Sequence, residues 1–178
     1  KPINIGEKLV VVPMWEKYDA KPHEVIVKMD PGMAFGTGTH ETTRLCATLL
    51  EKYVTPTSKM LDVGCGSGIL AICASKLGAS ECYGYDIDPV AVKVARENGK
   101  DNDCTNIECD VADLLKGVKE IKYDVITANI VADIIIRMLP DIHNFMHKDT
   151  VLVVSGIIDE RCEDVYKSIK ENNLAIIN

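Results

Sequence analysis

Met60-Leu-Asp-Val-Gly-Cys-Gly-Ser-Gly-Ile-Leu-Ala-Ile72 and Tyr83-Gly-Tyr-Asp-Ile-Asp-Pro89 are the two stretches of this 178-residue chain that decide its fold. In each, an apolar run typical of a buried strand ends at residues that can contact a ligand, which are three glycines in the first stretch and Asp86 in the second. Glycines let the backbone turn tightly and let a ligand approach, and a helix that follows them points amide donors at that ligand. An acid at the tip of the next strand can accept hydrogen bonds from two ribose hydroxyls. Together the stretches predict a nucleoside-binding site.

The spacing of the glycines indicates which nucleoside is bound. A dinucleotide fingerprint, G-x-G-x-x-G, would have its third glycine at position 69, where this chain has Ile69. The pattern here is the shorter G-x-G-x-G of Gly64, Gly66 and Gly68. That turn resembles motif I of the S-adenosylmethionine-dependent methyltransferases, which carry an acid on the strand before the glycines, here Asp62. A dehydrogenase site and an ordinary glycine-rich turn of an α/β protein are the alternatives.

Composition and charge narrow the class of protein. The chain is 47% hydrophobic and 26% charged, which is ordinary for a globular protein, and its length predicts one domain with a substantial core. The longest apolar stretch, residues 130–139, is interrupted by Asp133 and Arg137, so we expect no membrane span and no membrane partner. We also expect no secretory signal, because no charged-then-apolar segment opens this sequence. The net charge of −7 argues against direct binding to nucleic acid and is compatible with a basic protein substrate.

Cysteine and histidine usage predicts a cytoplasmic protein without a metal. The seven cysteines form no C-x-x-C pair, which favours reduced and mostly buried thiols. Cys65 lies inside the glycine turn, where a small residue that fills a tight turn is favoured over a catalytic thiol because the motif has no base partner. The four histidines show no spacing typical of metal ligands, so we predict no metal site.

Apolar periodicity predicts strands that alternate with helices. Strands are expected at Leu9–Val12, Glu24–Met29, Met60–Val63, Cys82–Asp86, Asn106–Asp110, Tyr123–Asn129, Thr150–Ser155 and Leu174–Ile177. Helices are expected after an N-cap at Thr39, after Gly68 as far as about Leu77, after the Asp88 cap, from about Ile130 and from Asp159. This alternation predicts an α/β fold with a mostly parallel sheet and helices on both faces. Ligands bind at the carboxyl ends of such strands, where four residues should converge: Gly64, Asp86, Asp110 and Asn129.

Four motifs carry a resemblance to a known family. They are Phe35-Gly-Thr-Gly-Thr-His-Glu-Thr-Thr43, the glycine turn, Gly84-Tyr-Asp-Ile-Asp88 and Ala128-Asn-Ile-Val-Ala132. In this order, and over nearly the whole chain, they resemble the PrmA family, bacterial methyltransferases of ribosomal large-subunit protein L-eleven. The resemblance implies a Rossmann-like class I methyltransferase fold, S-adenosyl-L-methionine as cofactor, and lysine and N-terminal amino groups of that ribosomal protein as acceptors.

The same resemblance implies a domain organisation. Residues 31–178 would form the S-adenosylmethionine-binding methyltransferase domain, and residues 1–30 a linker with N-terminal strands that leads into it. The family's N-terminal substrate-recognition domain and its last C-terminal strand are expected to be absent from this chain. The resemblance does not define the oligomeric state, for which we expect a monomer.

Site residues follow from the resemblance position by position. Asp86 would hold the ribose hydroxyls, Gly64 would face the methionine moiety, and Asp110 with Val111 would border the adenine. The loop at 35–38 would cover the methionine end and help to exclude water. The expected cofactor-binding residues are Phe35, Gly36, Thr37, Thr43, Asp62, Gly64, Cys65, Gly66, Gly68, Asp86, Ile87, Asp110, Val111 and Asn129.

Asn129 and Ile130 are the expected catalytic residues. The implied reaction is direct displacement of the sulfonium methyl group by an amine nitrogen, so the protein mainly supplies alignment and exclusion of water. A lysine amine has a reference pKa of about 10.4, and an apolar pocket favours its neutral form. The side-chain oxygen of Asn129 and the Ile130 carbonyl would accept hydrogen bonds from that amine and aim its lone pair. A carboxylate at position 129 would instead favour the ammonium.

Rival functions differ in the residues that they require. Methyltransferases of glutamine side chains usually carry Asn-Pro-Pro-Tyr after the fourth strand, where this chain has Asn129-Ile-Val-Ala132. A small-molecule methyltransferase is a further alternative, because specificity resides largely outside these motifs. A cofactor-binding protein without catalysis is the alternative from another class.

Overall fold

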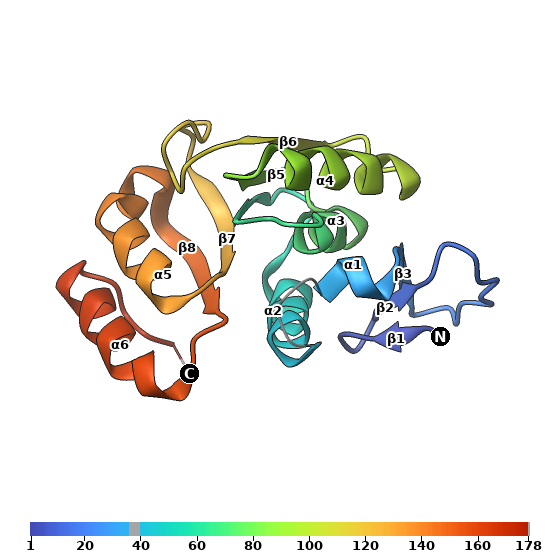
Figure 1. Cartoon of the computed structure of the whole chain (residues 1–178), viewed down its shortest axis with the longest axis horizontal. Helices are drawn as coiled ribbons and strands as arrows, with labels where there is room; N and C mark the ends of the chain where they lie inside the picture. Colours follow the sequence, from blue (N-terminus) through green and yellow to red (C-terminus); the bar gives the residue numbers. More distant parts are fainter. Residues whose placement is uncertain (36–39, 178) are drawn as a thin grey trace.

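A computed structural model describes residues 1–35 and 40–177. This part of the chain contains two sheets, a larger one with strand order β6-β5-β4-β7-β8 and a smaller one with order β1-β2-β3 at the N-terminal end of the molecule (Figure 1). The strands are β1 (Ile3–Asn4), β2 (Leu9–Val12), β3 (Val25–Lys28), β4 (Lys59–Val63), β5 (Glu81–Asp86), β6 (Ile107–Val111), β7 (Tyr123–Asn129) and β8 (Met146–Ser155). The helices are α1 (Pro31–Phe35), α2 (His40–Tyr53), α3 (Ile69–Lys76), α4 (Pro89–Asp101), α5 (Ala132–Met138) and α6 (Cys162–Glu171), with 3-10 helices η1 (Leu139–Phe145) and η2 (Asp159–Arg161).

The larger sheet is parallel throughout its described strands. Within this sheet, the first strand in sequence is the central strand β4. The chain then forms β5 and β6 on one side of β4, and β7 and β8 on its other side. The strand order therefore reverses between β4 and β7, and such a switch point leaves a crevice at the carboxyl ends of the strands. The predicted α/β class with a mostly parallel sheet is confirmed.

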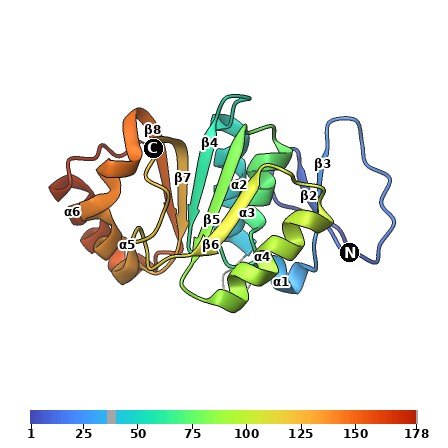
Figure 2. The same cartoon turned by 90° about the horizontal axis from the view of Figure 1, so that it is seen from above.

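Helices cover both faces of this sheet (Figure 2). The helices α2, α3 and α4 lie on one face, and α5 and α6 lie on the other. Successive side chains of β4 point to opposite faces, so Met60 joins the core beneath α2 and α3 while Leu61 joins the core beneath α5. A strand that is buried on both faces has to be apolar at consecutive positions, which explains the continuous apolar pattern that begins the glycine stretch.

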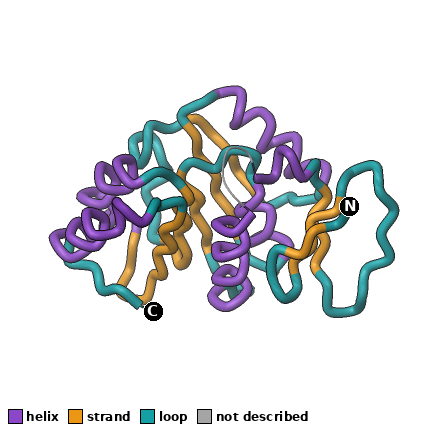
Figure 3. Tube along the Cα trace, turned by 60° about the horizontal axis from the view of Figure 1, so that its bottom comes forward, coloured by secondary structure: helices purple, strands orange, loops and turns teal. Residues whose placement is uncertain are grey.

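The small sheet shares its core with α2 and α3. Val11 and Val27 pack in the same buried cluster as Leu50 of α2. Glu51 of α2 fastens the turn between β1 and β2, because its carboxylate accepts backbone N–H bonds of 3.0–3.1 Å from residues 7–9. Figure 3 shows the three short strands at the N-terminal end, set beside the helices. None of the described helices is long and apolar enough to cross a membrane.

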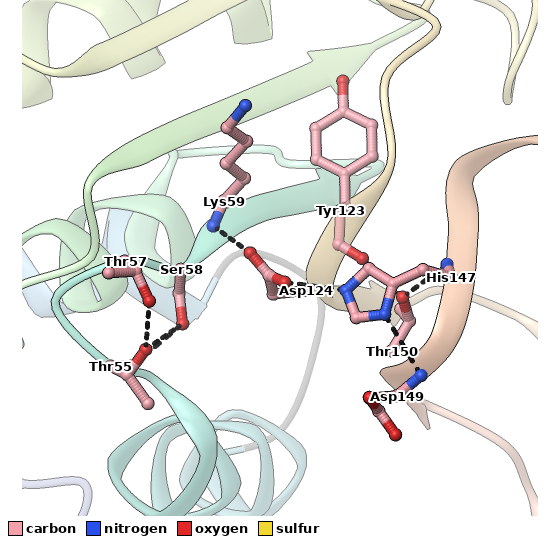
Figure 4. Close-up of polar contacts among 9 residues, drawn as sticks. All are labelled: Thr55, Thr57, Ser58, Lys59, Tyr123, Asp124, His147, Asp149 and Thr150. Atoms are coloured by element: carbon pink, nitrogen blue, oxygen red, sulfur yellow. Dashed lines mark hydrogen bonds and ion pairs between the residues drawn. The ribbon is translucent and has the colours of Figure 1, made fainter.

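The amino ends of β4, β7 and β8 are joined by Asp124 (Figure 4). One of its carboxylate oxygens accepts the backbone N–H of Lys59 at 2.8 Å, and the other lies 2.7 Å from Nε2 of His147. The backbone N–H of Asp149 donates to Nδ1 of that ring at 3.1 Å, so Nε2 carries the proton and donates to Asp124. This pair lies at the amino edge of the sheet, opposite the crevice, and stabilises strand pairing.

Most predicted elements are present, with small shifts at their ends. The strand expected at Leu174–Ile177 is wrong, because these residues form no strand. Asn173 has a left-handed φ of 59°, and the N–H of Leu174 bonds back to the carbonyl of Ile169 at 3.1 Å. This pattern ends α6 and leaves the apolar tail outside a sheet ladder. The N-cap expected at Thr39 lies outside the described residues.

Candidate active site

A cavity of about 830 Å³ opens at the carboxyl edge of the larger sheet. This volume lies in the range typical of small-molecule and cofactor sites. Its lining includes most of the residues predicted from the sequence, namely Phe35, Thr43, Asp62, Gly64, Cys65, Gly66, Asp86, Ile87, Asn129 and Ile130. Gly36 and Thr37 lie outside the described residues. The fold therefore brings residues that are distant in the sequence to one cavity.

The structural reason for a glycine differs among the three positions of the turn. Gly64 has a φ of +73°, and a Cβ there would lie 2.6 Å from Cγ2 of Ile130. Gly66 has a φ of +52°, and its Cβ would meet nothing within 4 Å. At Gly68, with a φ of +84°, the Cβ would lie 3.0 Å from the Cβ of Ala95. Gly68 therefore permits α3 to pack against α4 and does not line the cavity, whereas Gly64 and Gly66 do.

Asp86 connects the glycine turn to the second predicted motif. Its carboxylate accepts the backbone N–H of Gly66 at 2.9 Å and that of Asp88 at 3.0 Å. These bonds fix the carboxylate at the tip of β5. A carboxylate offers about four lone-pair sites, so Asp86 can still accept hydrogen bonds from two vicinal hydroxyls. Asp88 in turn caps α4, because its side chain accepts the N–H of Val90.

Asp62 lies on the buried floor of the cavity, below the glycine turn. It is 2% exposed, and the hydroxyl of Thr127 donates to its carboxylate at 2.7 Å. Burial raises the pKa of Asp62 to about 7, the hydrogen bond from Thr127 acts in the opposite direction, and the negative charge of Asp86 adds to the rise. Asp62 therefore changes charge near neutral pH.

Cys65 also lines the cavity but does not have the properties of a nucleophile. Its thiol is buried against Cys109, and the hydrogen bond with that cysteine, together with burial, raises the pKa of Cys65. A nucleophilic cysteine requires the thiolate. The interpretation of Cys65 as a small residue that fills the turn is consistent with this environment.

Asn129 and Ile130 stand where β7 and β8 end side by side. Asn129 is paired with Ser155, and the N–H of Ile130 donates to the Ser155 carbonyl at 3.2 Å. This bond extends the sheet by one residue, so α5 begins at Ala132 and not at Ile130 as expected. Both residues are half-buried and line the cavity.

The two residues predicted to border the adenine lie beside the cavity and not in its lining. Asp110 and Val111 do not line the cavity. The carboxylate of Asp110 lies 3.6 Å from Arg96, and Val111 is 45% exposed. β6 remains paired with β5 through Val111, and the chain turns toward the cavity only at Ala112, whose N–H bonds to the Asp86 carbonyl at 3.0 Å. Residues 112–114 therefore line the cavity at this position.

Several lining residues were missed by the sequence prediction. They are Met33, Ala34, Thr42, Val63, Ser67, Ile69, Leu70, Tyr85, Ala112, Asp113, Leu114, Val131, Ile134, Arg137, Gly156, Ile157 and Ile158. Gly156 could have been predicted from the sequence, because it directly follows a predicted strand, as Gly64 does. The apolar residues could not have been predicted, since an isolated apolar residue after a strand is typical of a core position.

Comparisons with known proteins agree with this geometry. A family model described as ribosomal protein L11 methyltransferase (PrmA) matches residues 1–178. The ribosomal protein L11 methyltransferase of Caldanaerobacter subterraneus subsp. tengcongensis is 52% identical over 171 residues, which cover 96% of this chain and 55% of that protein. The enzyme of the same name from Caldicellulosiruptor bescii is 52% identical over 177 residues, 99% of this chain and 57% of that protein. This chain thus spans little more than half the length of the curated relatives that it matches.

Solved structures show the same relationship. The crystal structure of ribosomal protein L11 methylase from Lactobacillus delbrueckii subsp. bulgaricus matches with a TM-score of 0.88 and 34% identity, over 96% of this chain and 86% of that one. Precorrin-6y C5,15-methyltransferase from Geobacter metallireducens matches with a TM-score of 0.64 at 14% identity over 78% of this chain and 73% of that one, which shows a shared Rossmann-like fold alone. With its whole length matched by the family model and half of its residues shared with curated members, the chain belongs to the PrmA family of ribosomal protein L11 methyltransferases.

Proposed function

We propose that this chain is the catalytic part of an S-adenosylmethionine-dependent N-methyltransferase that acts on amino groups of ribosomal protein L11. The observation that carries the proposal is the position of Asn129 and Ile130, which line the same cavity as the glycine turn and Asp86. The names of the curated relatives support the substrate, and a ribosomal protein substrate makes the cytoplasm the place of the reaction. Residues 31–178 are the proposed cofactor-binding domain.

The residues of the cavity fit the cofactor. Gly64 lines the cavity, and only glycine fits there because Ile130 occupies the space of a Cβ; its backbone is proposed to face the methionine end. Asp86 retains acceptor capacity for the ribose hydroxyls, and residues 112–114 form the wall proposed to hold the adenine. When bound, S-adenosylmethionine supplies a methyl group that is already activated for displacement.

The chain's own contribution is to bind and orient the acceptor amine. The Asn129 side-chain oxygen and the Ile130 carbonyl accept N–H bonds from the amine, which leaves its lone pair directed along the axis of attack. Both acceptors are uncharged, so they hold the amine without the strong preference for ammonium that a carboxylate would impose.

The acceptor must lose a proton before it attacks. Val131 and Ile158 are 59% and 63% exposed, so the mouth of the cavity lies at the surface. The proton of the approaching ammonium is therefore released to bulk water. Alignment of the neutral amine in the cavity then supplies the main rate advantage.

The test is methyl transfer from labelled S-adenosylmethionine to purified ribosomal protein L11 by the full-length protein, with the modified residues located by mass spectrometry. Asn129→Asp should lower the turnover number by about tenfold or more, because a carboxylate stabilises the ammonium. Asn4→Asp introduces the same charge at an exposed position of β1 and should retain full turnover. Transfer to glutamine or to a small molecule in place of L11 would favour the rival enzymes. Cofactor binding without any transfer would favour a binding protein.

A further inference from the structure

Gly156 directly follows β8 and faces the two proposed catalytic acceptors. A Cβ at this position would lie 3.0 Å from Oδ1 of Asn129 and 3.0 Å from the carbonyl oxygen of Ile130. It would also lie 3.3 Å from the backbone nitrogen of Ile130. The residue lines the cavity beside both of them. A single methyl group added at the end of β8 would therefore contact both acceptor oxygens.

The distances define what a side chain at position 156 would do. A contact of 3.0 Å between carbon and oxygen is closer than side-chain carbons normally approach, so Asn129 Oδ1 or the Ile130 carbonyl would have to move. The residue that carries this carbonyl is held at its own N–H, which donates to the Ser155 carbonyl at 3.2 Å and restricts the movement of the Ile130 backbone. The side chain of Asn129 would therefore give way by rotation. An amine hydrogen bond has a usable range of only about 2.7–3.2 Å, and displacement by a few tenths of an ångström would disturb it.

We propose that Gly156 is a positioning residue for the acceptor amine. By carrying no side chain, it keeps Oδ1 of Asn129 and the carbonyl of Ile130 aimed together at the place where the amine binds. This inference rests on the proposed function and deepens it, because it assigns the geometry of the amine site to the end of β8. Gly156 itself touches neither the reacting atoms nor the cofactor in this role.

A second explanation for the glycine is its backbone conformation alone, since its φ is +85°. Gly78, at the end of α3, separates the two explanations. It has a φ of +102°, and a Cβ there would meet nothing within 4 Å. Gly78→Ala therefore introduces comparable backbone strain away from the cavity, and Gly156→Ala introduces strain together with the contact to the two oxygens.

The first test is binding, which requires no acceptor protein. S-adenosylhomocysteine lacks the methyl group, and sinefungin carries a primary amine in its place. In titration calorimetry on the full-length protein, Gly156→Ala should weaken sinefungin by about tenfold relative to S-adenosylhomocysteine, the loss of one hydrogen bond to a charged group. Gly78→Ala should leave the ratio of the two dissociation constants unchanged. If Gly156→Ala leaves this ratio unchanged, whether both affinities stay the same or fall equally, the proposal is overturned.

A double variant tests whether the effect acts through Asn129. In the background of Asn129→Ala, the side-chain oxygen is gone, so adding Gly156→Ala should change the sinefungin ratio by less than about twofold. This background also removes the contact with Oδ1 of Asn129, one of the two 3.0 Å contacts that the new Cβ would make. A tenfold effect that persists without the Asn129 side chain would contradict the assigned role.

Turnover separates this inference from the proposed function. If the wild-type protein methylates L11, Gly156→Ala should lower the turnover number by about tenfold at saturating substrate, with little change in the KM for the cofactor. A wild-type protein that leaves L11 unmodified would overturn the proposed substrate. The ratio of sinefungin to S-adenosylhomocysteine would still decide the role of Gly156.

Discussion

The carboxylate of Asp62 and the hydroxyl of Thr127 form a buried 2.7 Å hydrogen bond that joins β4 to β7 beneath the glycine turn. Both residues are almost fully buried, at 2% and 0% exposed. Their bond crosses the point at which the strand order reverses. The floor of the cavity is thus held by a carboxylate whose pKa is raised by burial to about 7.

The raised pKa of Asp62 predicts a pH-dependent stability. The folded-state pKa of about 7 exceeds the unfolded-state value, which is about 3.9 for aspartate. Its favourable contribution is therefore complete below about pH 4 and is lost as the pH rises through about 7, with a slope of at most about 1.4 kcal/mol per pH unit. Asp62→Asn keeps an acceptor for Thr127 and removes this slope. Urea unfolding at several values between pH 4.5 and 8 measures it.

The matched control for this experiment is Asp101→Asn, which changes an exposed acid at the end of α4. Its unfolding free energy should follow the wild-type curve across the same pH range. If Asp62→Asn also runs parallel to the wild type, the buried carboxylate does not titrate in this window and the assigned environment is wrong.

Asp86 should contribute to cofactor affinity through charge-assisted hydrogen bonds. Asp86→Ala is expected to weaken S-adenosylhomocysteine binding by about 1.5–3 kcal/mol, or roughly 10- to 150-fold in the dissociation constant. Asp88→Ala is the control, because it removes the N-cap of α4 two residues away. This second change should cost about 1 kcal/mol of unfolding free energy and leave affinity nearly intact. Equal affinity losses in the two variants would remove the ribose role from Asp86.

Gly64 and Gly66 should respond differently to the same substitution. Both have a positive φ, but only at Gly64 would a Cβ overlap a neighbour, at 2.6 Å from Cγ2 of Ile130. Gly66→Ala should cost about 1–2 kcal/mol of unfolding free energy from backbone strain, and Gly64→Ala should cost more. Ile130→Ala removes the overlapping atom and should restore part of the loss in the Gly64→Ala background. Equal losses from the two glycine substitutions in thermal or urea unfolding would show that the overlap is relieved at no cost.

Glu51 should hold the small sheet to the rest of the chain. Its carboxylate accepts backbone N–H bonds from Glu7, Lys8 and Leu9. Glu51→Ala leaves these donors without their partner and should lower the unfolding free energy by about 1.5–3 kcal/mol. Glu51→Gln retains one acceptor oxygen and should lose less. Hydrogen exchange of residues 7–12 should accelerate in Glu51→Ala, and unchanged protection there would contradict the fastening role.

Sequence patterns predicted the features that follow from local chemistry. The apolar run of β4 requires helices on both faces, and the glycines and Asp86 mark the ends of two parallel strands. These signals predicted the fold class and put Asn129 at the end of a strand, and the resemblance added Thr43; both residues line the cavity. Local patterns were sufficient here because parallel strands bring their carboxyl ends to one edge by construction.

The features that were missed depend on tertiary contacts. The strand expected at Leu174–Ile177 has apolar residues typical of a strand, but a strand also requires a hydrogen-bonded neighbour, and that tail follows a helix cap. Asp110 lies at the end of a strand as expected, yet its side chain faces Arg96 of α4 and not the cavity. The importance of Gly156 comes from its contact with Asn129 and Ile130, which are remote in the sequence.

The most direct measurement of the central claim is a calorimetric titration of the protein with S-adenosylhomocysteine, with NAD as the reference ligand. The cavity, the G-x-G-x-G turn and Asp86 predict saturable binding of S-adenosylhomocysteine with one site per chain and no binding of NAD. Binding should weaken by roughly 10- to 150-fold in Asp86→Ala. Saturable binding of NAD in place of S-adenosylhomocysteine would contradict the assignment of this site to a methyltransferase.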